Sequence, residues 1–219
     1  LSETMSFASY SGDGKFNFVN IKPKYNISDI KWTINSDSII KHKIYKSKRE
    51  NMCSSVKAFY DWDNGLEEFR EMTPVYSADN LLPDYSYEKN GMILGDDLIA
   101  SFSKTFELRY HTTQEGDNHD KTPIDYIKWY LLNYCNQHLM IEFDADITYS
   151  GVEVGDLIHI PLINNSKAFG QDYSKVEQHN GQWVYPLWLV TGTDLKISGS
   201  SIPKITITAY QLHHLSEDL

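Results

Sequence analysis

TPIDYIKWYLLNYCNQHLMIEFDADITYSGVEVGDLIHI, residues 122–160, is the stretch that decides the fold, because it predicts a helix, a strand and a sharp turn in succession. Thr122 is a favourable N-cap, and Pro123 suits the first helical position, where the backbone needs no N–H. The stretch therefore predicts a helix over about residues 122–138. Its buried stripe is predicted from apolar residues at helical spacing, namely Ile124, Ile127, Leu131, Tyr134 and Cys135.

After this helix the apolar period changes to two. Alternate residues from Leu139 to Ile147 are apolar, which is the pattern of a half-buried strand. Residues 149–151 then turn the chain and residues 152–160 return it, with a tight turn or bulge at Gly155 and Asp156. The expected product is a helix packed on a β-hairpin.

The rest of the chain favours strands, since 15 Tyr and 5 Trp occur among its 219 residues together with many Val, Ile and Thr. We expect an α+β fold that is mainly β, with antiparallel sheets or small barrel-like β subdomains and one principal helix packed on a sheet. Strands are expected near residues 16–25, 30–44, 54–62, 104–110, 183–190 and 205–212, and turns at 35–37, 61–65, 191–194 and 199–201.

Changes in composition suggest the domain boundaries. Residues 1–14 are rich in Ser and Gly, which indicates a flexible arm or linker. Residues 73–92 lack a clear period and predict an irregular connection. We expect a β-rich subdomain at 15–72 and a helix-plus-β subdomain at 93–219, or one continuous domain over 15–219.

Charge and cysteine content exclude several classes of protein. The net charge of −10 argues against a large nucleic-acid-binding face, which needs clustered Lys and Arg. The basic run at 41–49 is interpreted as an exposed strand-to-loop segment rather than a nucleic-acid or lipid patch. Only Cys53 and Cys135 occur, so neither a disulfide framework nor a cysteine zinc site is expected. No window has the apolar length of a membrane span, no signal peptide is visible, and the initial Leu1 indicates a processed product or a fragment.

Carboxylates gather at two places. Residues 61–65 (DWDNG) are compatible with a calcium loop, but the glycine comes one place early for an EF-hand, and a hairpin turn with positive φ is favoured. Glu142, Asp144 and Asp146 share one face of a strand, which suits a hard cation or an acid and base for glycoside cleavage. A solvated strand face gives the same pattern and is the favoured interpretation.

No enzymatic signature stands out in the sequence. The histidines form no diagnostic metal-ligand pair, and neither a phosphate-binding glycine loop nor a nucleophile elbow occurs. We therefore expect no catalytic residue, metal or cofactor. The aromatic residues Trp62, Trp183, Tyr185 and Trp188 either form a platform for sugars or belong to a protein interface or a β core, and the second interpretation is favoured.

Three segments carry a resemblance to a known family: KTFELRYHTT (104–113), the longer run from KTPIDY to HIPLI (121–163), and WLVTGTDLKISGSSIPKITITAYQL (188–212). Their order of strand, helix, strand, E-x-G-D-x-I-x-I turn and late strand pair resembles the tail-hub, tail-tip or baseplate-hub proteins of tailed bacteriophages. The strand-rich stretch at 31–65 is similar to the part that precedes these elements in such proteins. No catalytic residue is carried over, because hubs of this type act as scaffolds.

The resemblance implies a β-rich virion adaptor that assembles as a ring, commonly a trimer, between tail tube and tail tip. Its partners would be other phage tail proteins, with DNA only as passing cargo and no membrane anchor. An acidic lumen would repel DNA phosphates and let the genome slide. Subunit contacts would use the loops 66–92 and 164–182 and the aromatic strand 183–190, with these interface residues: Trp183, Tyr185, Trp188, Trp62 and Tyr173.

Overall fold

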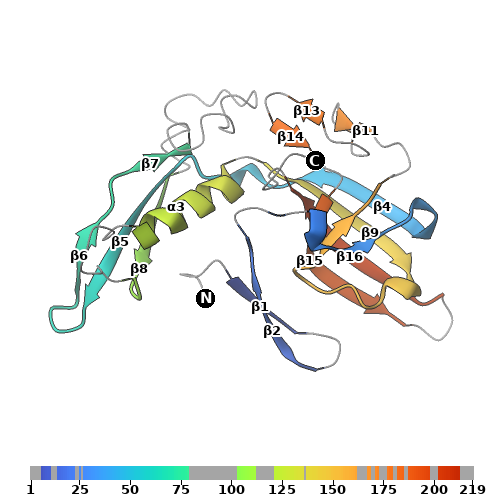
Figure 1. The fold of residues 1–219 in the computed structure, drawn as a ribbon, viewed down its shortest axis with the longest axis horizontal. Helices are drawn as coiled ribbons and strands as arrows, with labels where there is room; N and C mark the ends of the chain where they lie inside the picture. Colours follow the sequence, from blue (N-terminus) through green and yellow to red (C-terminus); the bar gives the residue numbers. More distant parts are fainter. Residues whose placement is uncertain are drawn as a thin grey trace. The chain divides into compact units, whose positions relative to one another are not determined.

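The computed structural model describes residues 6–10, 14–22, 25, 27–78, 103–111, 121–135, 137–161, 167–168, 171–172, 177–179, 182–184, 187–197 and 202–212. The chain divides into two compact units, Lys48–Gln137 and Ser6–Ser47 with His138–Leu219. Within the described residues, strands predominate and one α-helix occurs (Figure 1). The expected α+β, mainly β class is therefore confirmed. The chain passes between the two units near residues 47 and 137, where its composition changes little. The subdomain boundaries expected near residues 72 and 93 stay a prediction.

The second unit is built on a six-stranded sheet. Its central strands are antiparallel, and only β3 runs parallel to its neighbour β10. The order across the sheet is β3 (Ile30–Thr33), β10 (Leu157–His159), β15 (Leu187–Lys196), β16 (Lys204–Gln211), β9 (Leu139–Asp146) and β4 (Ile39–Lys46).

A short connection shows that this sheet is strongly curved. Its two edge strands, β3 and β4, are joined only by residues 34–38, which include the 3-10 turn Ser36–Ser38. Six flat strands would separate the edges by about 24 Å, whereas this link spans at most ~20 Å. The sheet must therefore curl so that its edges approach each other. The two edges do not pair in the described chain, so the sheet is open, and the barrel-like alternative is not realised as a closed barrel.

Both faces of the curved sheet bury apolar side chains. Alternate residues of β15 are buried on opposite sides, with Trp188 and Val190 in one cluster and Leu187 and Leu189 in the other. The first cluster is the larger and is continuous across the sheet, with Ile34, Ile141, Phe143, Ile158, Ile160 and Ile207 among its members. The second contains Tyr25, Leu157 and Leu212.

Hydrogen bonds at the turn of residues 153–156 hold β3 and β10 together. The buried Asp156 carboxylate accepts hydrogen bonds from Lys31 Nζ at 2.6 Å, from Trp32 Nε1 at 3.1 Å and from the Glu153 N–H at 3.1 Å. Gly155 adopts φ +92°, and a Cβ there would lie 2.3 Å from Val19 Cγ1. The sequence-predicted tight turn at Gly155 and Asp156 is confirmed.

Three two-stranded ribbons accompany the second unit's sheet. In the first, Val19 contacts Gly155, whereas Phe16 and Phe18 on the same strand are each 72% exposed. This ribbon includes residues 6–10, where the sequence indicated only an arm. The pairs are β1 (Ser6–Tyr10) with β2 (Phe16–Asn20), β11 (Lys167–Ala168) with β12 (Gln171–Asp172), and β13 (Glu177–His179) with β14 (Gln182–Val184).

The first unit packs helix α3 (Lys121–Tyr134) on a four-stranded sheet. The helix buries Ile127 and Leu131 as predicted, and Cys135 is buried just beyond its end, whereas Ile124 and Tyr134 of the predicted stripe are only half-buried. It ends at Tyr134 rather than near residue 138. Tyr134 O accepts the Cys53 N–H at 2.8 Å, which ties the helix end to the start of the central strand. That strand is β5 (Ser55–Asp63), which pairs with β6 (Glu68–Met72), β7 (Tyr76–Ser77) and the parallel β8 (Ser103–Leu108).

Two sequence predictions about neighbours are wrong. Residues 152–160 do not form a hairpin with β9, because β10 pairs with β15 and β3, and α3 packs on β5 rather than on that hairpin.

The turn predicted at residues 191–194 is also wrong, because these residues continue β15, with a register shift between Val190 and Gly192. No helix among the described residues is both long enough and apolar enough to cross a membrane.

Candidate interaction surfaces

The outer face of the six-stranded sheet carries a shallow charged hollow of about 240 Å³. Asp144 on β9 is one of its lining residues, and its carboxylate accepts hydrogen bonds from Lys204 Nζ at 2.6 Å and from Thr206 Oγ1 at 2.7 Å. The hydrogen bond from Lys204 is the main reason that the pKa of Asp144 lies below its ordinary value. Lysines from three strands surround it. The lining includes Lys41, Lys43, Lys196, Glu142 and Thr206.

The three carboxylates predicted on β9 do share this face, but two of them already have partners. Asp144 is paired as described, and Asp146 accepts the Thr148 N–H at 2.9 Å and so caps a 3-10 turn at Ile147–Tyr149. Glu142 is exposed and lies opposite Lys43 and Thr208. No group of three or more possible metal-ligating side chains occurs in the described part of the chain. The cation-binding hypothesis for these residues stays a prediction.

An aromatic cluster lies on the β5–β6 hairpin. Phe69 meets Trp62 at a ring-centroid distance of 4.8 Å and Phe59 at 6.0 Å. The Arg109 guanidinium lies 4.4 Å from the centroid of the Trp62 ring. One face of Trp62 is thus covered by a cation, and Phe69 packs against the same indole in a T-shaped arrangement, which favours a fixed protein surface over an open sugar platform. The interface prediction for Trp62 remains open.

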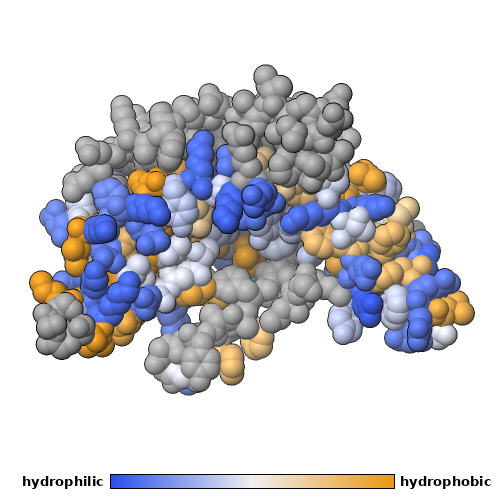
Figure 2. Space-filling view, turned by 180° about the vertical axis from the view of Figure 1, so that it is seen from behind, coloured by the Kyte–Doolittle hydropathy of each residue, from blue (hydrophilic) through white to orange (hydrophobic). Residues whose placement is uncertain are grey.

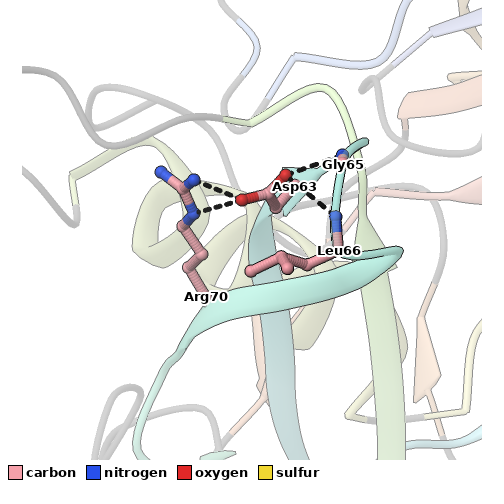
Figure 3. A network of polar contacts seen from close by, with 4 residues as sticks. All are labelled: Asp63, Gly65, Leu66 and Arg70. Carbon is pink, nitrogen blue, oxygen red and sulfur yellow. Dashed lines mark hydrogen bonds and ion pairs between the residues drawn. The ribbon is translucent and has the colours of Figure 1, made fainter.

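A polar network closes the tip of the same hairpin (Figure 3). Asp63 accepts hydrogen bonds from the Gly65 N–H at 2.7 Å and the Leu66 N–H at 3.2 Å, and it pairs with the Arg70 guanidinium. These contacts, Arg70 first, lower the pKa of Asp63. The hairpin interpretation of residues 61–65 is confirmed. The positive φ values fall at Asp61 (58°) and Glu67 (54°), however, and not at Gly65.

The remaining predicted interface residues fare differently. Trp188 is fully buried in the sheet core, where its own chain covers the ring, and its interface assignment stays a prediction. The densely apolar run 187–190 is explained by burial on both faces of β15. Trp183 lies on β14, of which only the backbone is described. Tyr173 and Tyr185 lie outside the described residues.

Several exposed apolar residues were missed by sequence reasoning. On the face in Figure 2, the described apolar residues form separate patches among hydrophilic ones. At the far end of β15 and β16, Leu195, Ile197 and Ile202 are 48%, 72% and 79% exposed. The alternation of Leu195 with Ile197 was a visible signal, but the expected turn at 191–194 hid its continuity with residues 187–190.

Neither a protein-family model nor a curated protein sequence matches the chain. Three solved structures resemble it weakly. The virion of a native gene transfer agent particle has 8% identity and a TM-score of 0.44, over 87% of this chain and 34% of that one. The tail protein from Neisseria meningitidis MC58 has 13% identity and a TM-score of 0.49, over 95% and 52%. The phage P2 baseplate in its activated conformation with Ca has 9% identity and a TM-score of 0.25, over 94% and 48%. The chain thus spans about a third to a half of the length of these proteins.

Proposed function

We propose that the chain is a structural component of a phage tail hub or baseplate, located in the virion, and that it acts through protein–protein interfaces without catalysis. In this role it is a ring-forming adaptor between tail tube and tail tip, with a trimer as the favoured assembly. Other tail proteins are its partners, and DNA passes it only as cargo.

The observation that carries the proposal is how the resembling segments fold. The strand–helix–strand–turn order of the resemblance is present as β8, α3, β9 and the turn at 153–156, followed by the strand pair β15 and β16. Asp156 and Gly155, both in the turn motif, hold the sheet together through buried contacts. The motif is therefore a structural device, as expected if the likeness concerns a scaffold rather than an active site.

The solved structures with weak similarity come from a gene transfer agent virion, a tail protein and a phage baseplate. Support for the proposal comes from the turn motif and from the exposed surfaces. Exposed apolar residues on both units, including Leu66 and Ile202, offer contact area for neighbouring subunits.

The test is the assembly state of the purified chain, alone and with the tail proteins encoded beside it. Light scattering is expected to give a defined oligomer, and electron microscopy is expected to show rings that stack on a tail-tube protein. A strictly monomeric chain that forms no stable complex with any of these proteins would end the proposal.

Carbohydrate binding remains the alternative, and no observation on the described residues favours it. Trp188 is buried and one face of Trp62 is covered, which removes two of the four aromatic residues from a sugar platform. Retained binding to a glycan array after Trp62→Ala and Trp183→Ala would exclude a platform on these residues.

A further inference from the structure

The two sides of β15 are paired to different extents. Strand β16 accompanies it from Trp188 to Lys196, whereas β10 accompanies it only from Leu187 to Leu189. Val190 makes the last bonds on the β10 side, accepting from the Gly155 N–H at 2.8 Å and donating to Asp156 O at 3.0 Å. From residue 191 onward, no strand in the described chain pairs with this edge of β15.

The change in burial begins at the same place. Residues 187–190 are buried and 193–197 are exposed, while the partner strand β16 keeps alternate residues buried along its whole length. A register shift between Val190 and Gly192 marks the boundary. Because bulges bend a strand and increase its twist, this one aims the far half of β15 away from β10. An unpaired edge of this kind is a template for another strand.

The free edge has one apolar and one charged face. Leu195 lies opposite Ile205, which is buried in the sheet core, so Leu195 and Ile197 continue the apolar inner face beyond the core. Asp194 and Lys196 lie on the other face, with Nζ and Oδ2 3.4 Å apart and half or more of each side chain exposed. A strand added here must be apolar on one side and charge-complementary on the other.

We propose that a second copy of this chain adds its own residues 193–197 to this edge, antiparallel and about a two-fold axis through Leu195. In this register Leu195 lies opposite the partner's Leu195, and Asp194 lies opposite the partner's Lys196 on both sides of the axis. The apolar residues meet on the inner face and the four charges alternate on the outer face. The contact is isologous, because the same edge serves both copies.

Other registers fit worse. A shift by one residue places Leu195 opposite a charged side chain and exchanges the two faces of one strand. If the register shifts by two residues, either Asp194 faces the partner's Asp194 or Lys196 faces the partner's Lys196. Like charges directly opposite each other are destabilising. The register centred on Leu195 is the one that satisfies both faces. The contact is short, so we expect a weak dimer whose population rises with concentration.

The register is tested by cross-linking full-length Leu195→Cys under copper-phenanthroline oxidation, in which the two thiols lose two hydrogens to the oxidant. Directly opposite residues in an antiparallel pair have Cβ atoms about 4.5–5.5 Å apart, close enough for a disulfide after small adjustment. We expect a covalent dimer for Leu195→Cys and little for Thr193→Cys, which faces residue 197. The wild-type chain is the background control, since Cys53 and Cys135 are buried. Equal cross-linking at both positions, or none at Leu195→Cys, overturns the register.

Charge reversal tests the same contact without cysteine. Sedimentation equilibrium is expected to show that Asp194→Lys weakens dimerisation at least about tenfold, because two symmetry-related pairs become repulsive. The double variant Asp194→Lys with Lys196→Asp restores opposite charges and is expected to recover the wild-type constant. Failure of the double variant to recover, with circular dichroism unchanged, overturns the proposal. A trimeric ring that shows no Leu195→Cys cross-link would refute this contact and leave the proposed function standing.

Discussion

Removal of the Asp156 carboxylate is expected to destabilise the second unit strongly. This carboxylate is 5% exposed and joins the side chains of Lys31 and Trp32 to the turn backbone at Glu153. In Asp156→Ala the Trp32 indole N–H and the Glu153 N–H, both partly buried, lose their acceptor. An unsatisfied buried donor costs about 1–3 kcal/mol, and hydrogen bonds to a charged acceptor lie in the upper part of that range.

The expected loss of unfolding free energy is the sum of unequal parts. Two lost, partly buried bonds to a charged acceptor give about 2–4 kcal/mol, whereas the Lys31 pair adds less than about 1 kcal/mol because that lysine is 64% exposed. Such a loss is a large fraction of the ~5–15 kcal/mol that a typical domain has. Urea unfolding followed by tryptophan fluorescence measures it, with hydrogen exchange of β3 and β10 reporting on the second unit alone.

Lys31→Met is the matched control, since it removes the exposed ion pair and leaves both buried bonds. It is expected to cost less than about 1 kcal/mol. Asp156→Asn keeps one acceptor oxygen and should fall between the two. If Lys31→Met costs as much as Asp156→Ala, or if Asp156→Ala costs under about 1 kcal/mol, the buried hydrogen bonds do not hold this turn and the reasoning fails.

Three further predictions concern single groups. Gly155→Ala is expected to lower the thermal midpoint markedly, because φ is +92° and the new Cβ would meet Val19 at 2.3 Å, while Gly192→Ala, with 3.8 Å of clearance, serves as the control in calorimetry. Burial lowers the pKa of His159, so stability should fall as the pH drops through about 6.5, where the unfolded chain binds a proton more readily, and His159→Gln should flatten that dependence in denaturation curves. Burial raises the pKa of the Cys53 thiol to about 11, so an alkylating reagent at pH 8 should label it only after urea unfolds the chain, and labelling of the native chain at the unfolded rate would contradict its placement.

The sequence predicts the faces of the elements well and their neighbours poorly. The alternation from Leu139 onward is reproduced as burial along β9, and the helical stripe at Ile127 and Leu131 is buried as expected. Periodicity reports which side of a strand meets the core, but it carries no information about which strand lies beside it. The sequence therefore did not predict the pairing of β10 with β15 and β3, because the short turn before β10 suggested a local hairpin.

The turn predicted from residue types at 191–194 is instead part of β15. The Thr-Gly-Thr-Asp sequence suits a turn, yet the ladder with β16 keeps these residues extended, and Thr191 Oγ1 donates to Thr208 O at 3.2 Å beside the register shift. The strand at 183–190 is predicted as an interface because burial on two faces and exposure to a partner both select large apolar residues. Only the three-dimensional neighbours of Trp188 distinguish the two.

The chain leaves the second unit after Ser47 and returns to it at His138. Ser47 and His138 face each other, since the Ser47 N–H donates to His138 O at 2.8 Å and the His138 N–H donates to Ser47 Oγ at 2.9 Å. Lys46 pairs with Leu139 next to them, so β4 and β9 would be an ordinary hairpin if residues 48–137 were absent. Residues 48–137 of the first unit are therefore an insertion at the tip of the β4–β9 hairpin, and the two ends of this insertion follow directly from neighbouring residues. The entropic cost of closing a loop grows only slowly with its length, so this hairpin tip can accept insertions of other lengths. During synthesis, the whole insertion must leave the ribosome before β9 can pair with β4.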